Sequence, residues 1–108
     1  MLDTLKRMLG IAADDTSPDD RLNDIINFTK QRLKVKLGGL EPPTELEYII
    51  IEVSIIRFNR IGSEGLDSHT VDGESLTFSD NDFKSFDNDI QDYLDAQKES
   101  KKGKVRFL

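Results

Sequence analysis

Hydrophobic residues repeat with helical spacing in the first third of the chain and predict two helices. Residues 2–9 place three leucines on one face and are followed by Gly10, which is typical of a short helix with a glycine cap. A second helix follows Ser17 and Pro18, a capping residue and a residue suited to the first helical position. Its apolar stripe continues to about Leu37, where two glycines end it.

The most informative stretch is residues 45–66, which predicts an apolar helix ending in a glycine-containing turn. Six residues follow one helical stripe: Leu46, Ile49, Ile50, Val53, Ile56 and Ile61. Four more stand off this stripe: Tyr48, Ile51, Ile55 and Phe58. Apolar groups therefore surround most of the helix axis, and a chain of 108 residues has few other elements to cover them. The pattern favours burial against a second copy of the protein or a different partner.

Two further elements are expected after this helix. Asp72 and Gly73 separate two short alternating runs, which is a strong signal for a β-hairpin near residues 68–78. A last helix begins at Ser79 or Asp80, and its apolar face is formed by Phe83, Phe86, Ile90, Tyr93 and Leu94.

Together these elements predict a mainly α fold, a small helical bundle of about four helices with one short β-hairpin and an extended C-terminal tail. The length fits one domain. We place a helical domain at residues 1–97 and a basic tail at residues 98–108.

Composition argues against several classes of protein. The chain has no cysteine, no tryptophan and one histidine, so thiolate metal chemistry and nucleophilic catalysis have little support. We therefore expect no enzyme, no cofactor and no metal site. The net charge of −6 argues against binding duplex DNA over the whole surface. The first residues lack the long apolar core of a signal peptide and no run approaches membrane-spanning length, so a soluble protein without a membrane partner is expected.

Charge is unevenly distributed along the second half of the chain. Residues 67–95 hold nine acidic residues against one basic residue, whereas residues 98–108 hold five basic residues against one acidic residue. In the tail, Lys104, Val105, Arg106, Phe107 and Leu108 alternate charged and apolar groups, as a strand added to the sheet of a partner would. The alternative is a disordered, solubilising terminus.

The motifs that suggest chemistry have simpler interpretations. Asp80, Asn81 and Asp82 resemble the start of an EF-hand loop, but Lys84 falls where an oxygen ligand is needed and the turn glycine is missing. Helix capping explains these residues better. The glycines of residues 62–65 lack the lysine of a phosphate-binding loop and indicate a turn.

Arg57 and Arg60 interrupt the apolar helix near its C-terminal end, and two interpretations remain open. Solvent exposure with a favourable helix dipole is the first. The second is a salt bridge between subunits, with an acidic residue of the next copy as partner.

In these features the chain resembles the small head-tail connector proteins of tailed bacteriophages, also called adaptor or head completion proteins. The similarity is closest in residues 45–66, where an apolar helix runs into Arg-Phe-Asn-Arg and then Gly-Ser-Glu-Gly. It continues through the turn at residues 71–75, the Phe-containing acidic helix and the Lys-Gly-Lys-Val-Arg-Phe-Leu end.

The resemblance implies a virion protein that forms a dodecameric ring beneath the portal protein, extends the DNA channel and provides the platform for tail attachment. The expected partners are other copies of the chain, the portal protein and further head completion or tail proteins. DNA would pass without specific binding, and the protein would reside in the host cytoplasm during assembly. The candidate subunit interface comprises Ile51, Ile55, Arg57, Phe58 and Arg60. The candidate portal contact comprises residues 104–108, and the candidate channel-facing residues are Asp67, Asp72 and Glu74, which would repel DNA phosphates.

A small helical regulatory or DNA-binding module is the alternative. It is weakened by charge, because only the basic second half of the helix over residues 19–37 presents cations on a helix face. Salt-dependent DNA binding would favour it.

Overall fold

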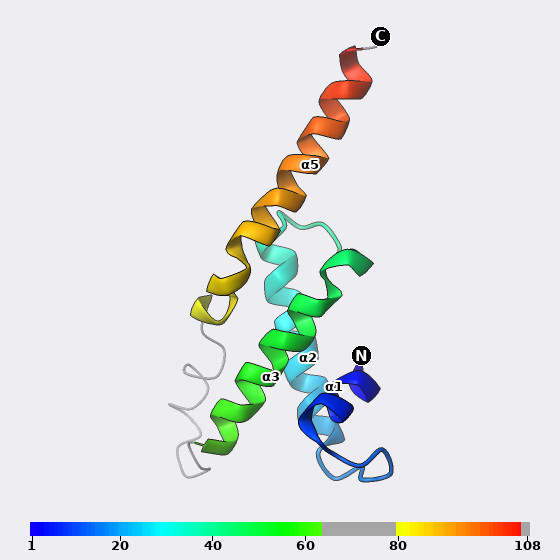
Figure 1. Cartoon of the computed structure of the whole chain (residues 1–108), viewed down its shortest axis with the longest axis vertical. Helices are drawn as coiled ribbons and strands as arrows, with labels where there is room; N and C mark the ends of the chain where they lie inside the picture. The colour runs from blue at the N-terminus through cyan, green and yellow to red at the C-terminus, as the bar shows by residue number, and fades with distance from the viewer. Residues whose placement is uncertain (64–79, 107–108) are drawn as a thin grey trace.

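The computed structural model describes residues 1–63 and 80–106, and this part of the chain is helical (Figure 1). It contains four α-helices and two short 3-10 helices: α1 (Leu2–Leu9), α2 (Asp19–Lys36), η1 (Thr44–Leu46), α3 (Glu47–Ser63), η2 (Asp80–Phe86) and α5 (Asp87–Arg106). These ranges contain no strand, and the mainly α fold with four helices is confirmed. The β-hairpin expected near residues 68–78 lies outside the described residues.

Glycine ends the first two helices as the sequence predicts. Gly10 follows α1 with a φ of 75°, and Gly38 and Gly39 follow α2 with φ of 72° and 94°, a backbone conformation that only glycine adopts without strain. The predicted cap of α2 is wrong, because Pro18 is the N-cap residue and its side chain accepts no hydrogen bond from the first turn of the helix. The Ser17 hydroxyl instead donates to Asp15 Oδ1 (2.6 Å). This hydrogen bond is the main reason that the pKa of the Asp15 carboxyl is lowered.

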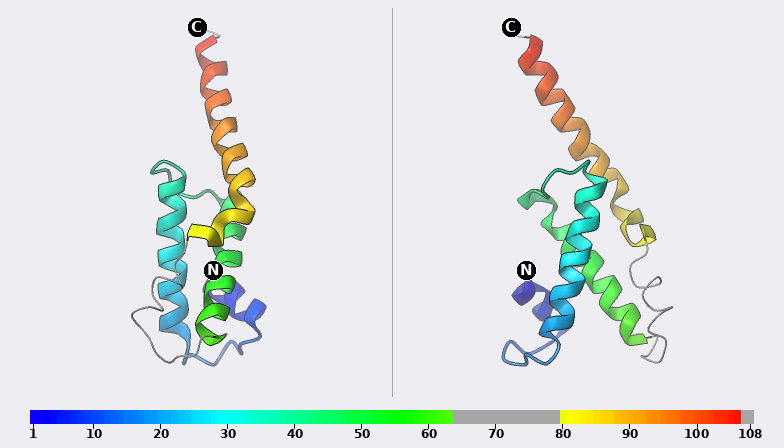
Figure 2. Two further views of the ribbon diagram at one scale, coloured as in Figure 1. Left: turned by 90° about the vertical axis from the view of Figure 1, so that its left-hand side faces the viewer. Right: turned by 180° about the vertical axis from the view of Figure 1, so that it is seen from behind.

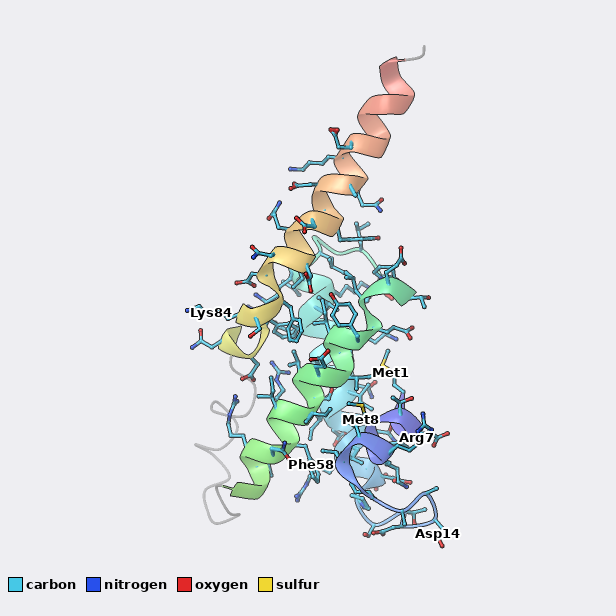
Figure 3. The ribbon with its side chains drawn as sticks, viewed as in Figure 1. Met1, Arg7, Met8, Asp14, Phe58 and Lys84 are labelled. Atoms are coloured by element: carbon cyan, nitrogen blue, oxygen red, sulfur yellow. The ribbon has the colours of Figure 1, made fainter. Side chains whose placement is uncertain are left out.

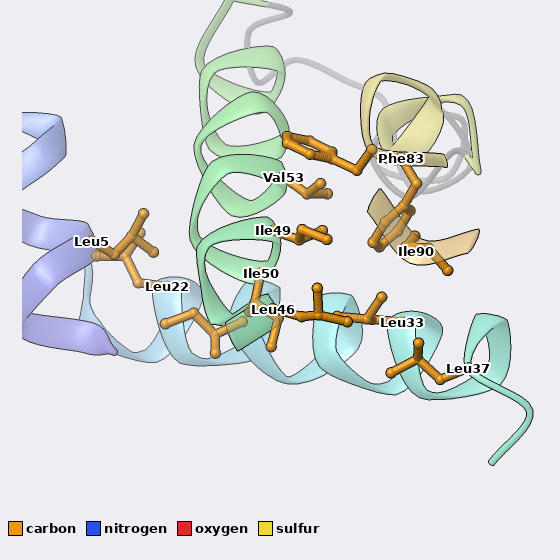
Figure 4. Packing of buried hydrophobic residues seen from close by; sticks show 12 residues of the cluster. Leu5, Leu22, Leu33, Leu37, Leu46, Ile49, Ile50, Val53, Phe83 and Ile90 are labelled. Atoms are coloured by element: carbon orange, nitrogen blue, oxygen red, sulfur yellow. The ribbon is translucent and has the colours of Figure 1, made fainter. Parts of the chain in front are cut away.

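The core lies where α2, α3, η2 and the start of α5 meet, with α1 packed on α2 and α3 (Figure 4). Its buried members come from every described element: Leu5, Leu22, Ile26, Leu33, Leu37, Leu46, Ile49, Ile50, Val53, Phe83, Phe86 and Ile90. The last three are buried as the sequence predicts, but the single final helix expected from Ser79 or Asp80 is wrong: Phe83 and Phe86 lie on the 3-10 helix η2, and only Ile90 lies on α5. Tyr93 and Leu94, also on α5, are half-buried.

Helix α3 contacts α1, α2 and η2, so three elements of its own chain pack around it. Ile51, Ile55 and Phe58 are half-buried and pack against the core. Much of the apolar surface for which the sequence predicted an external partner is therefore covered within the chain. Ile56 was assigned to the main stripe, but it is 39% exposed, because the elements around α3 leave its side open.

Helix α5 projects beyond the bundle and gives the molecule its elongated shape, 59 × 31 × 19 Å (Figures 1 and 2). Its first turns hold it to the core, whereas Asp95, Gln97 and Lys98 are exposed. The extended tail predicted over residues 98–108 is wrong for residues 98–106, because α5 continues as a helix to Arg106.

Candidate functional site

A buried polar cluster holds η2 against the bundle, and we call it the anchor. It consists of Thr29 on α2, Arg57 and Arg60 on α3, and Asp82 and Phe83 on η2. Thr29, Arg57 and Phe83 are at most 1% exposed, so the centre of the cluster is enclosed in the protein. The anchor therefore joins three elements that are far apart in the sequence.

Asp82 accepts hydrogen bonds from both arginines. Arg57 donates from Nε to Asp82 Oδ2 at 3.0 Å, and Arg60 donates from Nη1 to the same oxygen at 3.1 Å. Arg60 Nη2 forms a further ion pair with Asp82 Oδ1. The Asp82 side chain is only 3% exposed, and a carboxylate buried to this degree needs such compensation for its lost hydration.

Arg57 has further partners on α2 and η2. Its Nη1 donates to the Thr29 hydroxyl at 3.1 Å, and its guanidinium lies 5.4 Å from the centre of the Phe83 ring. Lys36 Nζ also lies 5.5 Å from the centre of that ring. A cation over an aromatic ring is favourable, and more so where water is excluded. Phe83 therefore fills the space between α2 and α3 while cations from both helices contact its ring.

The local sequence explains how these groups meet. Arg57 and Arg60 are three residues apart on α3, so they lie on the same side of the helix one turn apart. The 3-10 turn of η2 puts the adjacent Asp82 and Phe83 side chains onto α3 together. The anchor fixes where α5 leaves the bundle, because α5 follows η2 without a break. Its groups are paired with one another, so its role is positional.

Both interpretations of the arginines need correction. Arg57 is 1% exposed, so solvent exposure is wrong, and its acidic partner Asp82 belongs to the same chain, so the inter-subunit salt bridge is wrong for this residue. Arg60 is also paired with Asp82, although its side chain is 24% exposed. The sequence assigned Asp82 to helix capping. The available signal was two arginines in an apolar helix, which require an acidic partner when they are buried.

A second contact holds the start of α5 near the outer surface of α3. The Tyr48 hydroxyl donates to Asp89 Oδ2, and the Tyr48 ring meets the Phe86 ring edge-on at 6.1 Å between centres. The hydrogen bond to the Asp89 carboxylate is the main cause that raises the pKa of Tyr48 to about 12. The continuous segment of η2 and α5 is therefore held to α3 at two separate places, η2 by the anchor and the start of α5 by Tyr48.

The remaining candidate residues fall into three groups. Ile51, Ile55 and Phe58 share one side of α3, and their assignment to a subunit interface stays a prediction. Asp67, Asp72 and Glu74 lie outside the described residues. Of the portal contact, residues 104–106 belong to α5, and residues 107–108 lie outside the described part.

The described residues contain no group of three or more His, Cys, Asp or Glu side chains able to hold a metal ion. Among the helices of the same ranges, none has the length and apolar character needed to cross a membrane.

Comparison with known proteins identifies the family. Residues 1–93 match the family described as phage gp6-like head-tail connector protein. No curated protein and no solved structure gives a significant match. The family match covers α1, α2, α3, η2 and the first turns of α5, and it agrees with the resemblance found from the residues alone. The chain therefore belongs to the phage gp6-like head-tail connector proteins, a family of structural components of the virion.

Proposed function

We propose that the protein forms a dodecameric ring beneath the portal of a tailed phage, extends the DNA channel and serves as the platform for tail attachment. The family match over residues 1–93 is the observation that carries this proposal. The anchor supports it, because a rigidly positioned projecting helix suits a subunit that must present the same contacts at every place around a ring.

In this proposal the C-terminal end of α5 contacts the portal protein. Lys98, Lys101, Lys102, Lys104 and Arg106 concentrate positive charge there, and we expect an acidic portal surface as the partner. A ring presents many such ends at once, so weak individual contacts are sufficient. Residues 104–106 belong to the helix α5, so the portal would meet a helix end over these residues.

The acidic residues at positions 67, 72 and 74 are proposed to face the DNA channel. Negative charge on a channel wall repels phosphates and keeps DNA from adhering during passage. Replacing Asp72 and Glu74 together with lysine should make assembled particles retain DNA more strongly at low salt. Unchanged DNA retention and unchanged ejection would contradict a channel position.

The proposed function is tested by native mass spectrometry of the purified protein, alone and mixed with the portal protein of the same phage. We expect a ring-sized assembly that binds the portal, and we expect deletion of residues 105–108 to leave the ring intact while portal binding falls sharply. A protein that never binds the portal would overturn the proposal. Salt-dependent binding to duplex DNA by a protein that ignores the portal would favour the DNA-binding module instead.

A further inference from the structure

Helix α2 carries exposed apolar side chains on the side away from the core. Phe28 is 51% exposed and Val35 is 61% exposed. They are seven residues apart, so they lie two turns apart on one side of the helix. The core residues of α2, such as Leu22 and Leu33, point to the other side, where α3 packs. We call the surface around Phe28 and Val35 the α2 face.

A second apolar surface lies where α1 meets α3. Ile51, Ile55 and Phe58 form a half-buried stripe on α3, and Met8 on α1 is 59% exposed. Figure 3 shows Met8 and Phe58 on the side toward the viewer. Thioether side chains adapt to irregular contact surfaces, and exposed methionines are frequent at binding sites. We call this surface the α1/α3 face.

The two faces lie on opposite sides of the bundle. In the left view of Figure 2, α2 forms one side and α1 the other, with α3 between them. A single chain therefore cannot cover one face with the other. Two copies can, if the α1/α3 face of one meets the α2 face of the next.

The predominant charges beside the two faces have opposite signs. Arg21 and Arg32 flank Phe28 on the exposed side of α2, where Asp24 is the one acidic neighbour. Glu47 and Glu52 flank the α3 stripe, and Arg7 is an exposed basic residue next to Met8 on α1. Unlike charges favour the contact between unlike faces, and like charges oppose the contact of a face with its own copy.

We infer that the α1/α3 face of one subunit binds the α2 face of the next subunit. This inference rests on the proposed function, because it names the surfaces through which the ring would form. A contact between two different faces is heterologous. In a growing row of subunits, the first and last subunits therefore each have one uncovered face, and these two faces bind each other when the row closes into a ring. A two-fold dimer would need only one self-complementary face.

The test uses two variants, each with one face disabled. Met8→Glu introduces a charge on the α1/α3 face, and Phe28→Glu with Val35→Glu introduces charges on the α2 face. All three residues are exposed, so the fold should persist, as checked by circular dichroism. Ile56→Glu is the matched control, since Ile56 is also exposed on α3 but lies about 100° around the helix axis from Ile55.

Sedimentation velocity then reads the state of assembly. The wild-type chain and the Ile56 control should form the large oligomer, whereas each face variant alone should be monomeric. Mixed in equal amounts, the two variants should give dimers and nothing larger, because each retains the one face that the other needs. Assembly of either variant as in the wild type, or a mixture that stays monomeric, would overturn the inference.

The same experiment separates this inference from the proposed function. A wild-type chain that stays monomeric on its own overturns the inference, while portal binding by the wild-type chain still decides the proposed function. If the wild type binds the portal and both face variants assemble normally, the function stands and the ring uses other surfaces.

Discussion

Arg57 and Asp82 are 25 positions apart in the sequence, yet their side chains form an ion pair buried on both sides, with 3.0 Å between Nε and Oδ2. One residue belongs to α3 and the other to η2, so the pair joins these two elements. Burial makes this ion pair sensitive to substitution, because removing one partner leaves an uncompensated charge inside the protein.

We expect Asp82→Ala to lower the free energy of unfolding by about 3–5 kcal/mol, because Arg57 would stay buried without its acidic partner. The chain has no tryptophan, so urea unfolding is best followed by far-ultraviolet circular dichroism. Asp92→Ala, at an exposed position of α5, is the control and should change stability by less than about 0.5 kcal/mol. Equal midpoints for the two variants would contradict a structural role for the pair.

Replacing both partners by apolar residues should be less damaging than removing one. Arg57→Met with Asp82→Leu removes both buried charges of the pair, and such exchanges are often neutral or stabilising. Arg60 retains its exposed part and can reach solvent. A double variant less stable than Asp82→Ala would show that the anchor depends on its arginine geometry rather than on charge balance.

Replacement of the buried Ser54, one turn from Arg57 on α3, should not destabilise the protein. Its side chain is 0% exposed, and its hydroxyl oxygen has no hydrogen-bond partner in the part of the chain that the structure describes. Ser54→Ala should therefore leave stability unchanged or raise it by up to about 1 kcal/mol. Thr29→Val is the contrasting variant: it removes an acceptor of Arg57 and should cost about 1–3 kcal/mol. If Ser54→Ala lowered the free energy of unfolding as much as Thr29→Val, the Ser54 hydroxyl would have a hydrogen-bond partner after all.

Lys6 should be required for the connection between α1 and α2. Its ammonium group is buried, donates to the carbonyl oxygens of Ala13 (3.2 Å) and Asp15 (2.7 Å), and lies 2.9 Å from Asp19 Oδ1. Lys6→Met keeps an apolar stem but removes all three contacts, so we expect a loss of about 1–3 kcal/mol.

In limited proteolysis, residues 10–18 should also be cleaved faster in the Lys6 variant than in the wild type, because this segment loses the hydrogen bonds that Lys6 donates to Ala13 and Asp15. Arg7→Met is the matched control on the same helix, where the side chain is exposed and donates only to Thr4 among the hydrogen bonds found in the described residues. Equal cleavage rates in the two variants would argue against this role for Lys6.

Tyr48 predicts a stability change at alkaline pH. Its pKa is raised from 10.0 to about 12, because the protonated hydroxyl donates to Asp89. A group with a raised pKa in the folded state stabilises the protein below its unfolded pKa, and this contribution is lost as pH rises through the folded value. The stabilising contribution of Tyr48 should therefore decline between about pH 10 and 12.

Comparison of the wild type with Tyr48→Phe isolates this effect, since both chains keep Tyr93 and all lysines. The stability difference between the two proteins should be constant below pH 10 and shrink above it. Because Tyr48 is 39% exposed, solvent limits the size of the effect. A difference that stays constant up to pH 12 would contradict the hydrogen bond as its source.

The sequence by itself determined the local elements and the family. Leucine spacing with Gly10 and the paired glycines after Leu37 were enough to locate α1 and α2, because helix stripes and left-handed caps are set within a few residues. The apolar spacing of residues 83–94 was equally local. The succession of motifs from the apolar helix to the C-terminal end was the basis of the resemblance to connector proteins.

Only the tertiary structure decided what those elements bury. From the sequence, Asp82 was interpreted as a helix cap and Arg57 as an exposed cation or an inter-subunit partner. No local pattern shows that two residues 25 positions apart will meet. The partial burial of Ile51, Ile55 and Phe58 likewise depended on how the neighbouring elements pack on α3, which helical periodicity leaves open. Burial and ion pairing arise from the packing of whole helices, so they follow from the fold and not from the spacing of residues within one segment.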